Sequence, residues 1–257
     1  MTNVSIQGIP FDENSSYQKG HKLAPKLIRE VLNSGSMNLY AENGSSIEGY
    51  LNGDKGDFDI ESYFDIEKIT EQSLKQGDKL FTLGGDHSIT YPILKALHKK
   101  YPKLDILHID AHADLYDNFE GNLYSHACPF ARIMEDKLAE RLVQVGIRTL
   151  NPHQADQAAL FNVEIHTMKD WDISKLPKFE NPLYISLDMD GFDPAFAPGV
   201  SHHEPGGFTS RQVIEIIQSI DAEIVGADIV EYNPTKDFQN MTAFLAAKMM
   251  KEILVKM

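Results

Sequence analysis

Short apolar runs rich in β-branched residues alternate with helical patterns along the chain, and this alternation restricts the folds open to it. The clearest runs are KLFTL (79–83), KLDILHID (103–110), RLVQVGI (141–147), NPLYISLD (181–188) and EIVGADIV (223–230). Helices are predicted over 26–33, 91–100 and 241–255. Such alternation is typical of parallel strands joined by crossover helices. We therefore predict a three-layer α/β/α fold around a central, mainly parallel sheet.

Composition limits the class of protein and the kind of metal site. With 257 residues and 42% hydrophobic content, the chain can form a single domain over 1–257. No segment approaches the roughly 20 consecutive apolar residues of a membrane span, and the start, MTNVSIQGIPFDENSS, lacks the pattern of a signal peptide. We therefore expect a cytoplasmic protein without membrane contact. The net charge of −14 argues against binding nucleic acid. Cys128 is the only cysteine, so any metal must be held by histidine and carboxylate.

The strongest local signal is Asp110-Ala-His112-Ala-Asp114, which directly follows the predicted strand LDILHI. In extended backbone, residues two apart point to the same side, so these three side chains would converge at the carboxyl end of the strand. The alternative is a solvated acidic loop with an incidental histidine. Residues 43–60, rich in Gly, Asn and Asp without periodicity, are expected to form a surface loop.

Two further strands end in residues of the same kind. Asp188 and Asp190 end YISLDMD, and His87 follows FTLGGD. In an open parallel sheet, ligands bind beyond the carboxyl ends of the strands, so these residues should meet the first group. Burying four carboxylates requires neutralising cations, and one divalent ion is too few. Four carboxylates and two imidazoles without sulfur favour two Mn²⁺ ions.

Four segments in this order resemble the signature blocks of the ureohydrolases, the family of arginases, agmatinases and formimidoylglutamases: GGDHS (84–88), DAHAD (110–114), SLDMDGFDPAFAPG (186–199) and DIVEYNP (228–234). The resemblance covers nearly the whole chain. DNFEGNLYSHACPFARIME (117–135) and APGVSHHEPGG (197–207) are most similar to plant-type arginases. The resemblance implies an arginase-like fold, a small guanidino substrate cleaved with release of urea, two Mn²⁺ per chain, and a homo-oligomer, trimeric or hexameric.

The resemblance also implies a role for individual residues. Asp110 and Asp188 would bridge both ions. His87 and Asp114 would complete one coordination shell, and His112 and Asp190 the other. A hydroxide between the ions would attack the guanidinium carbon, since metal coordination lowers the pKa of bound water to roughly 7. Together with Asp114, the expected catalytic residues are Glu231, which would pair with the guanidinium, and His126, which would carry a proton to the leaving amine.

The substrate tail is less constrained by the sequence. Animal-type arginases hold the amino-acid end with an acid that follows a Gly-Leu-Arg strand end, and here Asn151 stands at the matching place. We expect Asn151 and the side chains of Asn118, Asn122 and Ser125 to contact the tail. L-Arginine is the expected substrate, and agmatine or another guanidino acid is the alternative.

Two alternatives of other kinds follow from the same residues. A deacetylase with a related sheet would bind a single zinc ion, which would not need His87, Asp114 and Asp190 as ligands. A non-catalytic relative, acting as a binding or regulatory subunit, would have lost a ligand or the acid at Glu231, and the sequence retains them all.

Overall fold

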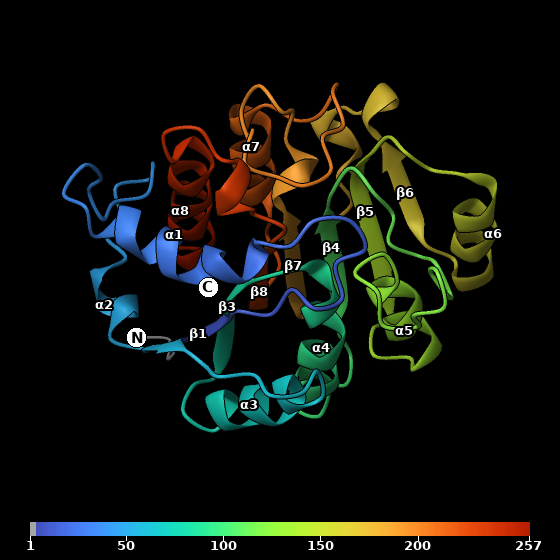
Figure 1. The fold of residues 1–257 in the computed structure, drawn as a ribbon, viewed down its shortest axis with the longest axis horizontal. Coiled ribbons are helices and arrows are strands. Elements are labelled where there is room, and N and C mark those ends of the chain that lie inside the picture. Colours follow the sequence, from blue (N-terminus) through green and yellow to red (C-terminus); the bar gives the residue numbers. More distant parts are fainter. Residues whose placement is uncertain (1–3) are drawn as a thin grey trace.

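The computed structural model describes residues 4–257, which build one parallel eight-stranded sheet between layers of helices (Figure 1). The strand order is β2-β1-β3-β8-β7-β4-β5-β6, and every neighbouring pair is parallel. The strands are β1 (Val4–Ile9), β2 (Asp54–Asp57), β3 (Lys79–Gly84), β4 (Asp105–Ile109), β5 (Arg141–Ile147), β6 (Glu164–Thr167), β7 (Leu183–Asp188) and β8 (Ile224–Val230). The predicted three-layer fold with a parallel sheet is confirmed.

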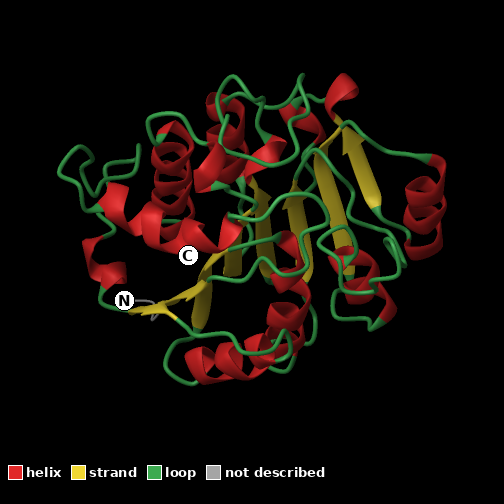
Figure 2. Ribbon diagram, in the orientation of Figure 1, coloured by secondary structure: helices red, strands yellow, loops and turns green. Residues whose placement is uncertain are grey.

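Helices cover both faces of this sheet (Figures 1 and 2). They are α1 (Ala24–Leu32), α2 (Glu48–Leu51), α3 (Asp65–Leu74), α4 (Thr90–His98), α5 (Pro129–Glu135), α6 (Pro152–Phe161), α7 (Ser210–Ser219) and α8 (Met241–Leu254). Helices α1, α7 and α8 pack in one apolar cluster with the sheet, and α3, α4 and α5 pack in a second. Within residues 4–257, no helix combines the length and apolar character needed to cross a membrane.

The central strands β3, β4, β7 and β8 are buried at every position and mostly apolar, because both of their faces are covered. Along β3, Leu80 belongs to the cluster with α3 and α4, whereas Phe81 and Leu83 belong to the cluster with α1 and α8. Successive side chains of a strand point to opposite faces, so a strand buried on both sides is apolar along most of its length. For this reason the predicted runs coincide with β3, β4, β5, β7 and β8.

The expectation of a plain surface loop over 43–60 is wrong, since α2 and the edge strand β2 lie within it. The β2 sequence DKGD has no apolar residue to signal a strand, and its residues alternate between half-buried and exposed. Short, charged edge strands of this kind also protect a sheet against further pairing. Neither β1 nor β6 was predicted. In β1, the buried polar Gln7 interrupts the apolar pattern, and its amide donates to Thr82 Oγ1 at 3.2 Å.

The segment between α1 and α2 is tied to α7 by a bidentate ion pair. Arg211 donates to both oxygens of Glu42, at 2.6 and 2.8 Å, and this contact lowers the pKa of Glu42 from 4.5 to about 2. A carboxyl group with a lowered pKa stabilises the fold above its unfolded pKa, and this stability is lost as the pH falls toward the folded value. We expect Glu42→Gln to lower the melting temperature at pH 7, with a difference from the parent that shrinks between pH 4.5 and 2.

Melting curves of the parent and of Glu42→Gln at a series of pH values check this prediction. Arg211→Gln is the matched control, because it removes the other partner of the same ion pair and should produce the same loss at pH 7. A difference that stays constant down to pH 2 would show that the carboxylate charge is not responsible.

Candidate metal centre and active site

Polar side chains gather where four neighbouring strands, β3, β8, β7 and β4, reach their carboxyl ends. His87 follows β3, Glu231 follows β8, Asp188 ends β7 and Asp110 follows β4. Residues far apart in the sequence therefore meet because their strands are adjacent in the sheet. This edge is the usual ligand-binding position of an open parallel sheet.

Short turns after the strands fix the side chains locally. His87 lies in the 3-10 turn η2 (His87–Ile89), which is capped by Asp86 through the N–H of Ser88 at 3.0 Å. After β7, the turn η5 (Met189–Gly191) is capped by Asp188, whose Oδ1 accepts the N–H of Asp190 at 2.7 Å. These caps fix the backbone that carries His87, Asp188 and Asp190.

The six predicted metal ligands lie together, in two groups that share Asp110. The first group surrounds His87 Nδ1, which is 3.3 Å from Asp110 Oδ2, 3.2 Å from Asp114 Oδ2 and 3.0 Å from Asp188 Oδ2. The second surrounds His112 Nδ1, which is 3.5 Å from Asp110 Oδ1 and 3.1 Å from Asp190 Oδ2. Asp110 thus faces one group with each of its oxygens.

The segment after β4 reaches this arrangement in a different way from the one the sequence suggested. The strand ends at Ile109, so the alternation of an extended backbone does not continue through Asp114. Instead, Asp110 Oδ1 accepts the N–H of His112 at 2.6 Å, which bends the chain. Asp114 has φ of 50°, in the left-handed region that few residues other than glycine adopt. This turn directs Asp114 toward His87, while His112 faces Asp190.

The electrostatics of the cluster are those of a cation site. Burial, with the charges of Asp110 and Asp190, raises the pKa of Asp188 well above its ordinary value. Burial also raises the pKa of Asp190, to about 6. Burial lowers the pKa of His87, but hydrogen bonds to Asp110, Asp114 and Asp188 outweigh it and raise the pKa. Crowded, buried carboxylates with nitrogen partners and no sulfur fit divalent metal ions such as Mn²⁺.

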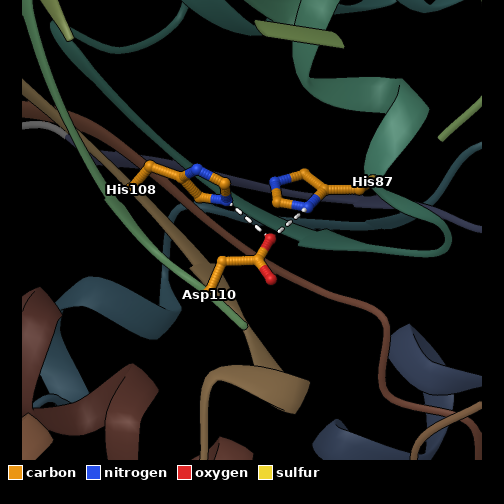
Figure 3. A group of neighbouring side chains, drawn as sticks. All are labelled: His87, His108 and Asp110. Carbon is orange, nitrogen blue, oxygen red and sulfur yellow. Dashed lines mark hydrogen bonds and ion pairs between the residues drawn. The ribbon is translucent and has the colours of Figure 1, made fainter. Parts of the chain in front are cut away.

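His108, on β4, lies against this cluster without belonging to the predicted set (Figure 3). Its Nε2 is 2.6 Å from Asp110 Oδ2, and its Nδ1 is 3.0 Å from Gln144 Nε2. The Gln144 amide also donates to the carbonyl of Ala113 at 2.6 Å, so it presents its N–H₂ group to His108. Nδ1 must then accept, and Nε2 carries the hydrogen donated to Asp110. His108 therefore orients the carboxylate of Asp110 by hydrogen bonding.

Glu231 and His126 form a second, adjacent cluster. Glu231 follows β8 in the left-handed region, with φ of 60°, and its N–H donates to the carbonyl of Gly85 at 2.9 Å. Its Oε1 is 2.9 Å from His126 Nδ1, and its Oε2 is 3.0 Å from His21 Nε2. Burial favours the neutral carboxyl, but the charges and hydrogen bonds of His21 and His126 outweigh it and hold the pKa of Glu231 well below its ordinary value.

Both clusters open into one cavity of about 270 Å³. Metal-cluster residues His112, Asp114, Asp188 and Asp190 line it together with His126 and Glu231; the remaining lining residues are Ser16, Tyr116, Phe119, Ala127, Thr149, Gln154, His202 and Glu204. The ring of His202 lies 5.3 Å from that of His126, between centroids. A cavity with carboxylates at its base suits a small cationic group.

The residues predicted for the substrate tail do not line this cavity. Asn118 Oδ1 accepts the N–H of Gly121, Asn122 Oδ1 accepts that of Tyr124, and Ser125 is buried. Asn151 caps α6 by accepting the N–H of Gln154 at 2.9 Å, and its amide donates to the hydroxyl of Tyr116. Asn151 thus contacts two residues that line the cavity, Gln154 and Tyr116, but does not line it itself. A direct contact of Asn118, Asn122, Ser125 and Asn151 with the substrate tail stays a prediction.

The amino-terminal loop supplies residues that the sequence did not single out. Ser16 Oγ is 2.8 Å from His126 Nε2, and the carbonyl of Asn14 accepts the N–H of His126 at 3.1 Å. His21 contacts Glu231 from the same loop. Ser, Asn and a lone His carry no spacing signal in this segment, so only the fold shows that they belong to the site.

Comparison with known proteins agrees with this geometry. Residues 2–256 match the Arginase family. A mitochondrial arginase 1 of Arabidopsis thaliana is 42% identical, over 99% of this chain and 81% of the relative. The solved structure of an arginase from Medicago truncatula is 40% identical with a TM-score of 0.92, over 100% of this chain and 87% of that one. An agmatinase of Bacillus anthracis is 33% identical, over 99% of this chain and 91% of the relative.

The expected cytoplasmic location is contradicted by these relatives, because the Arabidopsis protein is a mitochondrial arginase. Targeting information occupies a short segment that the fold and the site do not constrain, so composition and fold do not determine the compartment. The agreement in sequence and structure extends over nearly the entire chain in each comparison. The chain therefore belongs to the arginase family, whose members are hydrolases of the C–N bonds of amidines.

Proposed function

We propose that this chain is an arginase, which hydrolyses L-arginine to L-ornithine and urea with two Mn²⁺ ions per chain. The observation that supports this most is the position of Glu231, a buried carboxylate that lines the same cavity as four of the six proposed metal ligands. The identity of 42% to a plant arginase favours arginine over agmatine. Agmatine remains the alternative, because an agmatinase is 33% identical over 99% of the chain.

Six side chains would hold the metal ions, with His87 and Asp114 on one side and His112 and Asp190 on the other. Asp110 would serve both ions, since each of its oxygens faces a different histidine, and Asp188 is proposed as the second shared ligand. When bound, the ions would lower the pKa of water to roughly 7 and so supply a nucleophile at neutral pH.

Glu231 would bind the guanidinium in the cavity. A planar cation with several N–H donors is best matched by a carboxylate that is kept charged, and the neighbouring imidazoles hold the pKa of Glu231 low. This contact places the guanidinium carbon beside the metal cluster, which lowers the entropic cost of the attack.

His126 would deliver the proton that the leaving amine needs. Its Nδ1 is bonded to Glu231 and its Nε2 to Ser16, and these contacts place the ring in the cavity wall. Burial lowers the pKa of His126, but Glu231 outweighs it and raises the pKa to about 9. A histidine that is protonated near neutrality can act as a general acid. Asp114 also lines the cavity and would contribute to catalysis as a metal ligand.

Urea release from three guanidino compounds tests the proposal. Mn²⁺-loaded protein should release urea from L-arginine with a kcat/KM about tenfold or more above those for agmatine and guanidinobutyrate, a ratio that corresponds to roughly 1.4 kcal/mol of transition-state binding. A preference for agmatine would show that the chain is an agmatinase and not an arginase. Urea from none of the three would overturn the proposed function.

We also propose that residues 1–257 act as one ureohydrolase domain and assemble into a homo-oligomer, a trimer or a hexamer. Light scattering at micromolar concentration should give a mass of at least three chains. A monomeric mass would contradict this part of the proposal.

A further inference from the structure

His21 contacts the proposed guanidinium-binding carboxylate from a segment outside the signature blocks. It lies in the 3-10 turn η1 (His21–Leu23) before α1, and its side chain is fully buried. Nε2 is 3.0 Å from Glu231 Oε2 and 3.0 Å from Ser201 Oγ, while Nδ1 is 3.3 Å from Ser15 Oγ. An ionised carboxylate can only accept hydrogen bonds, so Nε2 carries a hydrogen directed at Glu231.

The loop that carries His21 is attached to the segment that carries Glu231. Gly20 adopts φ of 137°, and a Cβ at this position would come 2.3 Å from Asn233 Oδ1. The amide of Asn233 donates to the carbonyl of Lys19 at 3.3 Å and to Ser201 Oγ at 2.8 Å. The side chain of Asn233 therefore holds the segment of His21 against the segment of Glu231.

Glu231 has few acceptor positions left for a substrate. Oε1 accepts from the N–H of His87 at 2.8 Å and from His126 Nδ1 at 2.9 Å, and Oε2 faces His21. A carboxylate offers about four acceptor positions, so about one remains. A guanidinium that donates two parallel N–H bonds needs one position on each oxygen. One of the present partners must therefore leave Oε1 when the substrate binds.

The two imidazoles differ in their freedom to leave. His126 lines the cavity, whereas His21 does not and is fully buried behind Glu231. The remaining donor to Oε1 is the backbone N–H of His87, in a turn capped by Asp86. Of these donors, His126 alone has open space on the side from which a substrate arrives.

We propose that His21 is the positioning residue of Glu231, which it holds through Oε2 while His126 yields Oε1 to the guanidinium. This inference rests on the proposed function and deepens it. The exchange leaves His126 beside the guanidinium nitrogens, where a proton donor is needed. His21 stays outside the cavity and acts only through the carboxylate.

Steady-state kinetics of Mn²⁺-loaded variants test the proposal. Without the Nε2 donor, Glu231 can turn toward His126, which then competes with the substrate for the carboxylate. His21→Leu should therefore lower kcat/KM about 10- to 100-fold, mainly through a higher KM. His21→Gln places an amide N–H₂ near the same position and should restore most of the loss. Lys22→Ala, in the same turn with its side chain exposed, is the matched control and should stay within about threefold of the parent, as surface changes do.

The double variant with Glu231→Gln separates positioning from general damage to the loop. If His21 acts through the carboxylate, His21→Leu should change kcat/KM by less than about threefold in the Glu231→Gln background, since coupled residues are non-additive. An equal loss in both backgrounds, or a single-variant loss that falls on kcat with KM unchanged, would overturn the proposal.

A second measurement does not depend on urea release. In denaturant unfolding of the metal-loaded chains, the four members of this cycle should be non-additive by about tenfold in the unfolding equilibrium constant. Additive values would show that the contact carries no coupling and would overturn the proposal even if the enzyme releases urea. If His21 and Glu231 are coupled in unfolding but no substrate yields urea, the proposed function is wrong and the positioning role of His21 is not. Should His21→Leu not fold, His21→Asn, whose shorter amide does not reach Glu231, takes its place in the same cycle.

Discussion

Protein stripped of its metal ions will release no urea and will melt at a lower temperature than the loaded protein. The reason lies in the four buried aspartates of the cluster, Asp110, Asp114, Asp188 and Asp190, whose charges repel one another without cations. An ion that binds only the folded chain stabilises it by about 2.7 kcal/mol at a free concentration of 100 times Kd. In a chain of this size, that corresponds to roughly 5–10 °C per ion.

Calorimetry and urea release before and after chelation, with Mn²⁺ then added back, measure both effects. Mg²⁺ at the same concentration is the control, because it prefers an all-oxygen, largely hydrated site and should restore less activity than Mn²⁺. Full activity in metal-free protein, or an unchanged melting temperature, would remove the basis for a metal centre at these residues.

Glu231→Gln will lower catalytic efficiency by about 30- to 1,000-fold, against every guanidino substrate alike. The substitution keeps the shape of the side chain but replaces a charge-assisted contact by a neutral one, at a cost of roughly 2–4 kcal/mol in the transition state. It also leaves His21 and His126 facing an amide, whose N–H₂ group cannot accept their hydrogens.

The control for this variant is Glu252→Gln, a change of the same kind at a buried glutamate of α8 outside the cavity. It should cost stability and leave kcat/KM near the parent value. If Glu231→Gln stays within a few-fold of the parent while metal content is intact, the pairing of Glu231 with the guanidinium must be abandoned.

The central part of the fold and the metal cluster could be predicted from the sequence because their signals are local. Strands β3, β4, β7 and β8 are buried on both faces and form apolar runs, and the proposed metal ligands lie at or shortly after the ends of β3, β4 and β7. The rule that parallel strands place their carboxyl ends at one edge then brings His87, Asp110 and Asp188 together.

The remainder of the site depends on contacts between distant segments, which no local pattern shows. His21 lies 210 residues from its partner Glu231 in the sequence numbering, and Ser16 meets His126 only because the amino-terminal loop crosses the sheet edge. The left-handed turn at Asp114 was also hidden, since the alternating pattern of 110–114 reads equally well as extended chain. Edge strand β2 was not predicted because its sequence contains no apolar residue.

A titration of urea release from L-arginine against equivalents of Mn²⁺ tests the central claim most directly. Metal-free protein at a concentration well above Kd should gain activity in proportion to added Mn²⁺, and the curve should break at two equivalents per chain. Substitution of His112 by Asn, which removes a ligand from one group only, should leave one tightly bound ion and little activity. A break at one equivalent with full activity in the parent would contradict a centre in which two ions act together.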